Sequence, residues 1–125
     1  MIADHRLTVM LPAKDIARAS RWYEEKLGLK PDSTADYGVS YTLTGGTPMF
    51  LYESQFAGTA QHTLLSFDTS DLAGDMKALR DKGVSFEDYD LPELKTEDGI
   101  ASFGEVKNAW FKDSEGNILG LVQGM

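Results

Sequence analysis

The sequence predicts an α+β protein of two βαβββ modules, which together form a single domain of residues 1–125. Three observations lead to this prediction: an internal repeat, an amphipathic helix in each half, and strands separated by turns after each helix. A chain of 125 residues suits one domain and is too short for two ordinary ones. Its balance of 42% apolar and 26% charged residues allows a sizeable core. We place the modules at residues 1–57 and 61–125.

The internal repeat aligns residues 8–16 with residues 64–72. Each copy holds a short apolar strand, a polar step, an aspartate and then an amphipathic stretch. Asp15 and Asp71 stand where helix N-caps belong. Apolar residues then recur with helical spacing, and Gly28 and Gly83 indicate the helix ends. The two apolar faces are Ile16, Ala19, Tyr23 and Leu27 in the first half, and Leu72, Met76 and Leu79 in the second.

Each predicted helix is followed by strands. Residues 39–44 and 47–53 flank Gly45-Gly46, which predicts a hairpin with a two-residue turn because glycine supplies the positive φ of such turns. In the second half, strands at 109–112 and 118–123 flank a longer turn rich in turn-forming residues. Residues 87–105 hold seven acids and one lysine, which predicts a solvated loop around one short strand.

Composition excludes several classes of function. There are 12 basic against 20 acidic residues, a net charge of −8, so the chain lacks the basic surface that nucleic acid binding needs. No apolar run approaches the roughly 18 residues of a membrane helix. The first residues do not resemble a signal peptide, and there is no cysteine for a disulfide, a thiolate metal site or a nucleophile. We expect a cytoplasmic protein that binds neither nucleic acid nor membrane.

Three segments, in this order and at this spacing, resemble the vicinal oxygen chelate superfamily: residues 9–15, 21–29 and 110–121. This superfamily includes glyoxalase I, extradiol dioxygenases, methylmalonyl-CoA epimerase and bleomycin-resistance proteins, and the segments are most similar to the bleomycin-resistance branch. The resemblance implies the glyoxalase/bleomycin-resistance-like fold, in which the sheets of two modules form a cupped surface that holds a ligand. It also implies a homodimer, with the modules paired either within a chain or by exchange between chains.

The resemblance further implies where a metal would bind. Metal-dependent relatives use four His, Glu or Gln ligands, and the corresponding positions here are Thr8, Phe50, Leu64 and Gly120. This set cannot chelate a divalent ion, so we expect no metal and no cofactor. The two histidines, His5 and His62, stand at non-equivalent positions and are interpreted as surface residues. We identify no catalytic residue.

The aromatic residues are the stronger candidates for a binding site. With a two-residue turn at Gly45-Gly46, Tyr41 would oppose Phe50, and both would share a sheet face with Tyr52. Pairing Lys112 with Ile118 would place Trp110 opposite Gly120, whose missing side chain leaves space for a ring or a ligand. The full set of candidate ligand-binding residues is Thr8, Met10, Tyr41, Phe50, Tyr52, Leu64, Trp110 and Gly120. The alternative is that these rings are ordinary core, because aromatic residues dominate cores as well as pockets.

Three functions are therefore open. The leading hypothesis is a metal-independent homodimer that sequesters a small molecule, as bleomycin-resistance-type proteins do. Its ligand would be cationic or aromatic, given the acidic charge and the aromatic residues. The second is an enzyme: a glyoxalase-like lyase or isomerase with a non-standard site, or a metal-free hydrolase or isomerase. The third is a dimeric scaffold that binds no small ligand.

Overall fold

The computed structural model describes residues 1–125 and contains two helices and ten strands, preceded by a short 3₁₀ helix at Ile2–Asp4. The first half holds β1 (Val9–Ala13), α1 (Ile16–Leu27), β2 (Ser33–Ala35), β3 (Gly38–Thr42) and β4 (Pro48–Glu53). The second half holds β5 (Thr63–Asp68), α2 (Leu72–Asp81), β6 (Asp90–Leu91), β7 (Leu94–Lys95), β8 (Ala101–Phe103), β9 (Val106–Lys112) and β10 (Ile118–Gln123). No helix is long and apolar enough to cross a membrane.

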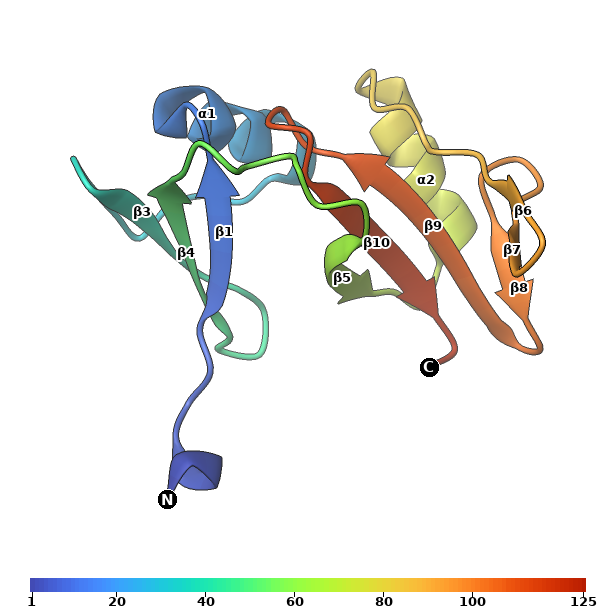
Figure 1. The fold of residues 1–125 in the computed structure, drawn as a ribbon, viewed down its shortest axis with the longest axis horizontal. Helices are drawn as coiled ribbons and strands as arrows, with labels where there is room; N and C mark the ends of the chain where they lie inside the picture. The colour runs from blue at the N-terminus through green and yellow to red at the C-terminus, as the bar shows by residue number, and fades with distance from the viewer.

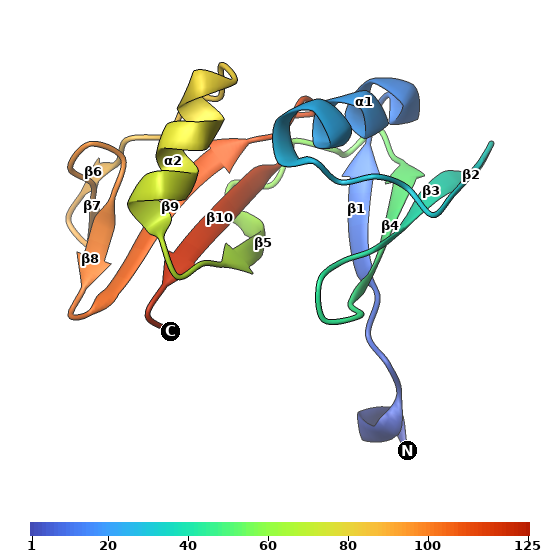
Figure 2. The same cartoon turned by 180° about the vertical axis from the view of Figure 1, so that it is seen from behind.

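The two halves repeat one topology, which confirms the predicted pair of βαβββ modules. Their four-stranded sheets have the orders β1-β4-β3-β2 and β5-β10-β9-β8, each with one parallel pair at the inner edge. The sheets lie side by side, with β1 and β5 as the edge strands nearest each other (Figures 1 and 2). In Figure 2, which views the molecule from behind, α2 lies in front of the second sheet, and α1 packs against β3 and β4 of the first. Each sheet therefore keeps one face that no helix covers.

Both predicted helix starts are confirmed. The side chain of Asp15 accepts a hydrogen bond from the Arg18 backbone N–H, and Asp71 caps α2 in the same way through the Gly74 N–H. These carboxylates satisfy amide groups that would otherwise have no partner at a helix N-terminus. Gly28 ends α1 in the left-handed conformation, as its position in the sequence predicts.

One hydrophobic core joins the two modules. Sixteen buried residues from both helices and both sheets form a single cluster. The rings of Trp22 on α1 and Phe111 on β9 are stacked with centroids 6.4 Å apart. Within β1 and β4 the buried side chains alternate with exposed or half-buried ones, so Leu11 and Leu51 face the helices while Met10 and Phe50 face the uncovered side.

A buried polar cluster also joins the modules. It lies at the turn between β9 and β10, where Asp113, Glu115 and Asn117 are all less than one tenth exposed. Asn117 donates to the Pro12 carbonyl oxygen at 2.8 Å and accepts from the Gly58 N–H at 3.0 Å. The turn of the second module is thereby bonded to the first strand of the other module and to the connector between them.

The register of the first hairpin differs from the prediction. The Leu43 N–H donates to the Thr47 carbonyl, so Gly45 and Gly46 belong to a three-residue loop rather than a two-residue turn. Tyr41 consequently pairs with Met49, and Phe50 pairs with Ser40. A shift of one residue moves a side chain to the other face of a sheet. The prediction that Tyr41 opposes Phe50 was wrong for this reason.

Residues 87–105 also contain more structure than expected. β6 and β7 form a two-stranded hairpin, and β8 pairs with β9 as the outer strand of the second sheet. These strands are only two or three residues long. Strands this short are stabilised by pairing with a neighbouring strand. They are also too short to show the alternation of apolar and polar residues by which a strand is predicted from sequence.

Candidate functional site

The uncovered face of the first sheet carries a hollow of about 450 Å³. It is bordered by candidates from the sequence, Thr8, Met10 and Phe50, together with Asp32 and Ser40. The Met10 side chain in this wall is 50% exposed. The wall mixes apolar with polar side chains, and the Asp32 carboxylate accepts a hydrogen bond from the Thr42 hydroxyl at 2.6 Å.

The Phe50 ring is held in place by its neighbours. A Cβ atom at Gly38 would collide with this ring, so the glycine leaves the space that the ring occupies. The exposed ring of Tyr37 lies 6.1 Å from it. Tyr52 is two residues further along β4 and half-buried, on the same face as Phe50. Phe50 and Tyr52 therefore share the uncovered face of the first sheet.

Tyr41 lies differently from these residues. It borders the hollow, but its side chain is buried on the helix side, where its hydroxyl donates to the Ser20 hydroxyl of α1 at 3.2 Å. Burial raises the pKa of the Tyr41 hydroxyl. The hydroxyl therefore stays protonated at neutral pH and serves as a donor rather than as a base.

The second sheet presents Trp110 and Gly120 as directly opposed residues, as predicted. The indole N–H of Trp110 donates to the Thr63 hydroxyl at 3.0 Å, and the Tyr89 ring meets the indole edge to face at 5.5 Å. The space beside Gly120 is not free, because a Cβ atom there would meet the Ser66 hydroxyl oxygen. A serine side chain thus takes part of the volume that the sequence assigned to a ring or a ligand.

Leu64 occupies an irregular position. The pairing of β5 with β10 passes from Thr63–Ile118 directly to Leu65–Leu119, which leaves Leu64 without a paired residue at a bulge. Its half-buried side chain packs against the shared core. A bulge changes the direction of a side chain, so the direction of the Leu64 side chain does not follow from simple alternation along β5.

A second hollow, also about 450 Å³, lies at the end of the second sheet beside Tyr89. Its polar wall includes Glu87, Asp88 and Lys112, and the Lys112 ammonium lies 3.3 Å from the Glu87 carboxylate. Burial and the neighbouring Glu87 carboxylate raise the pKa of the Tyr89 hydroxyl, against a smaller opposite effect of Lys112. Sequence reasoning missed Tyr89 because it lies in the stretch interpreted as a solvated loop.

One chain does not bring the candidate residues into one cavity. The hollow on the first sheet is lined only by residues up to Phe50, and the hollow beside Tyr89 only by residues from Gly58 onward. Thr8, Met10 and Phe50 form one group, and Trp110 with Gly120 forms another. Each group lies on the uncovered face of its own sheet.

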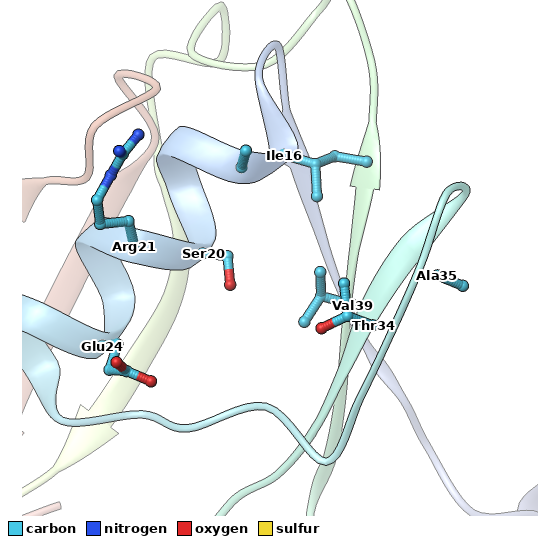
Figure 3. A pocket seen from close by; sticks show the side chains of 8 residues that line it. Ile16, Ser20, Arg21, Glu24, Thr34, Ala35 and Val39 are labelled. Atoms are coloured by element: carbon cyan, nitrogen blue, oxygen red, sulfur yellow. The ribbon is translucent and has the colours of Figure 1, made fainter.

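A third hollow, which the sequence did not indicate, is the groove of about 460 Å³ between α1 and the β2–β3 hairpin (Figure 3). The Ser20 hydroxyl and the Glu24 carboxylate come from α1, whereas Thr34 and Val39 come from the strands. The Arg21 side chain extends away from Thr34 and Val39. The groove is on the helix side of the sheet and is thus separate from the face that carries Phe50.

Comparison with known proteins places the chain in a family. A model of the Glyoxalase/Bleomycin resistance protein/Dioxygenase superfamily matches residues 5–121. The chain belongs to this superfamily. The resemblance of the three sequence segments is thereby confirmed, and the two βαβββ modules are the arrangement expected of it. No curated protein matches the chain in sequence.

Solved structures share this superfamily fold at low sequence identity. TnmS3, an antibiotic binding protein from Streptomyces sp. CB03234, is 22% identical, with a TM-score of 0.69 over 100% of this chain and 99% of that one. UcmS2 is 17% identical, with a TM-score of 0.70 over 94% and 96%. The fosfomycin resistance protein FosX from Listeria monocytogenes is 11% identical, with a TM-score of 0.71 over 98% and 94%. At these identities the similarity establishes the fold.

The metal site of metal-dependent superfamily members does not fit this chain. Of the four corresponding positions, only Thr8 offers a side-chain oxygen, while Phe50, Leu64 and Gly120 offer no donor atom. The exposed His62 directs its Nδ1 to the Thr63 carbonyl oxygen at 3.1 Å. No group of three or more His, Cys, Asp or Glu side chains is arranged to hold a metal ion.

Proposed function

We propose that this protein is a metal-independent homodimer that binds and sequesters a small cationic or aromatic molecule, and that it works in the cytoplasm. The observation that carries the proposal is the pair of uncovered sheet faces, which display aromatic rings and no set of metal ligands. Phe50 and Tyr52 lie on one face, and Trp110 with Tyr89 lies on the other. The net charge of −8 attracts cations, and the rings can stack on them. The fold shared with an antibiotic binding protein agrees with this function.

A second copy would complete the site. Each chain leaves the two aromatic groups on separate faces, so a partner is needed to bring two such faces together around a ligand. Leu7, Met10 and Tyr37 are at least half exposed on or near the first face. β1 and β5 each have an edge that no other strand pairs with, and such edges favour association with another chain.

Two measurements test the dimer: the mass in solution, and the effect of a charged residue placed on the uncovered face of the first sheet. Light scattering should give about twice the chain mass of 13.8 kDa at micromolar concentration. Met10→Asp should weaken association by about tenfold or more, because the carboxylate would lose its water at a buried interface. Leu91→Asp is the matched control, since Leu91 is 46% exposed but lies on β6. A monomeric native protein would contradict the proposal.

Ligand binding is tested at Trp110. A thermal-shift screen of cationic and aromatic compounds should yield ligands that raise the unfolding midpoint. Trp110→Ala should weaken their binding by about 2 kcal/mol or more if the indole is an anchor of the site. Trp22→Phe is the control, because Trp22 packs between Tyr23 and Phe111 on the helix side. Equal affinity of a ligand for the native protein and for Trp110→Ala would place its site elsewhere.

The same purified protein separates the alternative functions. Stoichiometric nickel or zinc together with turnover in a glyoxalase assay would favour the glyoxalase-like lyase or isomerase. A screen that yields no ligand for an intact dimer would favour the scaffold.

A further inference from the structure

A cleft of about 330 Å³ lies on the helix side of the second sheet, between the end of α1 and α2. In Figure 2 both helices are seen on the near side of the sheets, and the end of α1 lies close to β10 and β5. Its volume is within the range of small-molecule sites. It is separate from the site proposed above, because it opens on the opposite face of the sheet from Trp110.

The floor and walls of the cleft are apolar and come from both modules. Phe111, Leu121 and Leu79, which belong to the buried core, form the floor. Leu27 and Leu29 from the first module and Phe67 from β5 form half-buried walls. Apolar surface in this arrangement is shielded best by an apolar ligand group.

The apolar surface continues beyond this cleft. Leu29 and Phe67 also line a neighbouring hollow of about 530 Å³ that lies between the two sheets. Val9, Leu43 and Leu65 form apolar parts of its wall. A ligand with a flexible chain could therefore pass between Leu29 and Phe67 and remain on apolar surface.

The rim of the cleft is cationic, in contrast to the acidic chain as a whole. Lys26 and Lys82 both line it. The Lys26 ammonium donates to the Lys82 carbonyl oxygen at 2.5 Å, whereas the Lys82 ammonium makes no ion pair or hydrogen bond. The one acid of the rim, Asp75, already accepts a hydrogen bond from the Thr69 hydroxyl. Two ammonium groups above an apolar floor are complementary to an anion with an apolar tail.

We propose that this cleft binds an aliphatic monocarboxylate, with its carboxylate at Lys26 and Lys82 and its chain over Phe111 and Leu121. Neither an alcohol nor an amine of the same length has the charge that this rim selects. Longer chains should bind more tightly than short ones until the path between Leu29 and Phe67 is filled, because each added methylene buries further apolar area.

Calorimetric titration with decanoate tests the site. Decanoate should bind once per chain, and decylamine should bind about tenfold more weakly or not at all. Ala78→Phe should abolish binding, because Ala78 is an exposed residue of α2 that lines the cleft and a ring there would fill it. Ala73→Phe is the matched control, since Ala73 is exposed on the same helix and does not line the cleft. Lys82→Gln should weaken binding about threefold, and Lys95→Gln should leave it unchanged.

Three results would overturn the proposal. They are no binding of decanoate up to about 1 mM, equal binding of decanoate by the native protein and Ala78→Phe, and equal binding of decanoate and decylamine by the native protein. Trp110→Ala should bind decanoate as the native protein does. Failure of this site is therefore distinguishable from failure of the proposed small-molecule site on the uncovered faces.

Discussion

Replacing Asp113 with alanine is expected to destabilise the protein by about 3–5 kcal/mol, since it leaves buried polar groups without a partner. The Asp113 carboxylate accepts hydrogen bonds from the Tyr23 hydroxyl at 2.5 Å and from the backbone N–H groups of Glu115 and Asn117. It also accepts from the Asn117 side-chain amide at 2.9 Å. Alanine would remove this acceptor from the Tyr23 hydroxyl and from both backbone N–H groups, and the Asn117 amide would keep only its bond to the Pro12 carbonyl oxygen, in a region where water has little access.

Urea unfolding at one fixed protein concentration measures this loss. Tyr23→Phe removes only one of the donors and should cost about 1–2 kcal/mol. Asp68→Ala is the surface control, because the Asp68 side chain is exposed and makes no hydrogen bond. This variant should stay within about 0.5 kcal/mol of the native protein. A loss below that of Tyr23→Phe would mean that Asp113 is only a turn former.

Glu115→Gln is expected to lower the free energy of unfolding at neutral pH by as much as about 3 kcal/mol. The Glu115 side chain is fully buried, and it accepts from the Arg18 guanidinium at 2.8 and 2.9 Å. It also accepts from the backbone N–H groups of Lys14 and Asp15 and from the Ser114 hydroxyl. Glutamine keeps similar shape but loses the charge that pairs with Arg18.

The effect should depend on pH in a defined direction. The Arg18 guanidinium, with help from the Asp15 N–H and the Ser114 hydroxyl and against the effect of burial, lowers the pKa of Glu115 from 4.5 to about 2. The unfolded chain therefore takes up this proton at a higher pH than the folded protein does. The stabilisation is complete above about pH 5 and is lost as the pH falls from about 4.5 to about 2.

The measurement is the difference in unfolding free energy between the native protein and Glu115→Gln across this pH range. The difference should be constant above about pH 5 and should shrink toward pH 2. Glu93→Gln is the control, because the Glu93 side chain is exposed and makes no hydrogen bond or ion pair. The unfolding free energy of Glu93→Gln should stay close to that of the native protein across the whole pH range. A Glu115→Gln difference that does not change with pH would show that the ionised carboxylate contributes nothing specific.

Local signals in the sequence were sufficient for the modules. The helix starts at Asp15 and Asp71 depend on hydrogen bonds between residues three apart in the sequence. The helical faces depend on the spacing of apolar residues. The pairing of Trp110 with Gly120 followed from a turn whose residues strongly prefer that conformation. These features repeat in both halves, so the resemblance to the superfamily could be recognised from short segments.

The face on which Tyr41 lies was not determined locally. Gly45 and Gly46 permit both a two-residue and a three-residue loop, since glycine adopts a positive φ in either. Packing decided between them. In the observed register Tyr41 and Met49 enter the core together, and the Tyr41 hydroxyl reaches Ser20 on α1.

Long-range contacts decided the rest. Asp113 and Asn117 have the sequence signature of turn formers, and they do form a turn, but their side chains also bond Tyr23 and Pro12, which are 90 and 105 residues away. The sequence by itself determined the two modules, their helices and the family. Only the tertiary structure showed that one polar turn joins the modules and that Phe50 and Trp110 lie on separate faces, because these relations depend on how two sheets pack around a shared core.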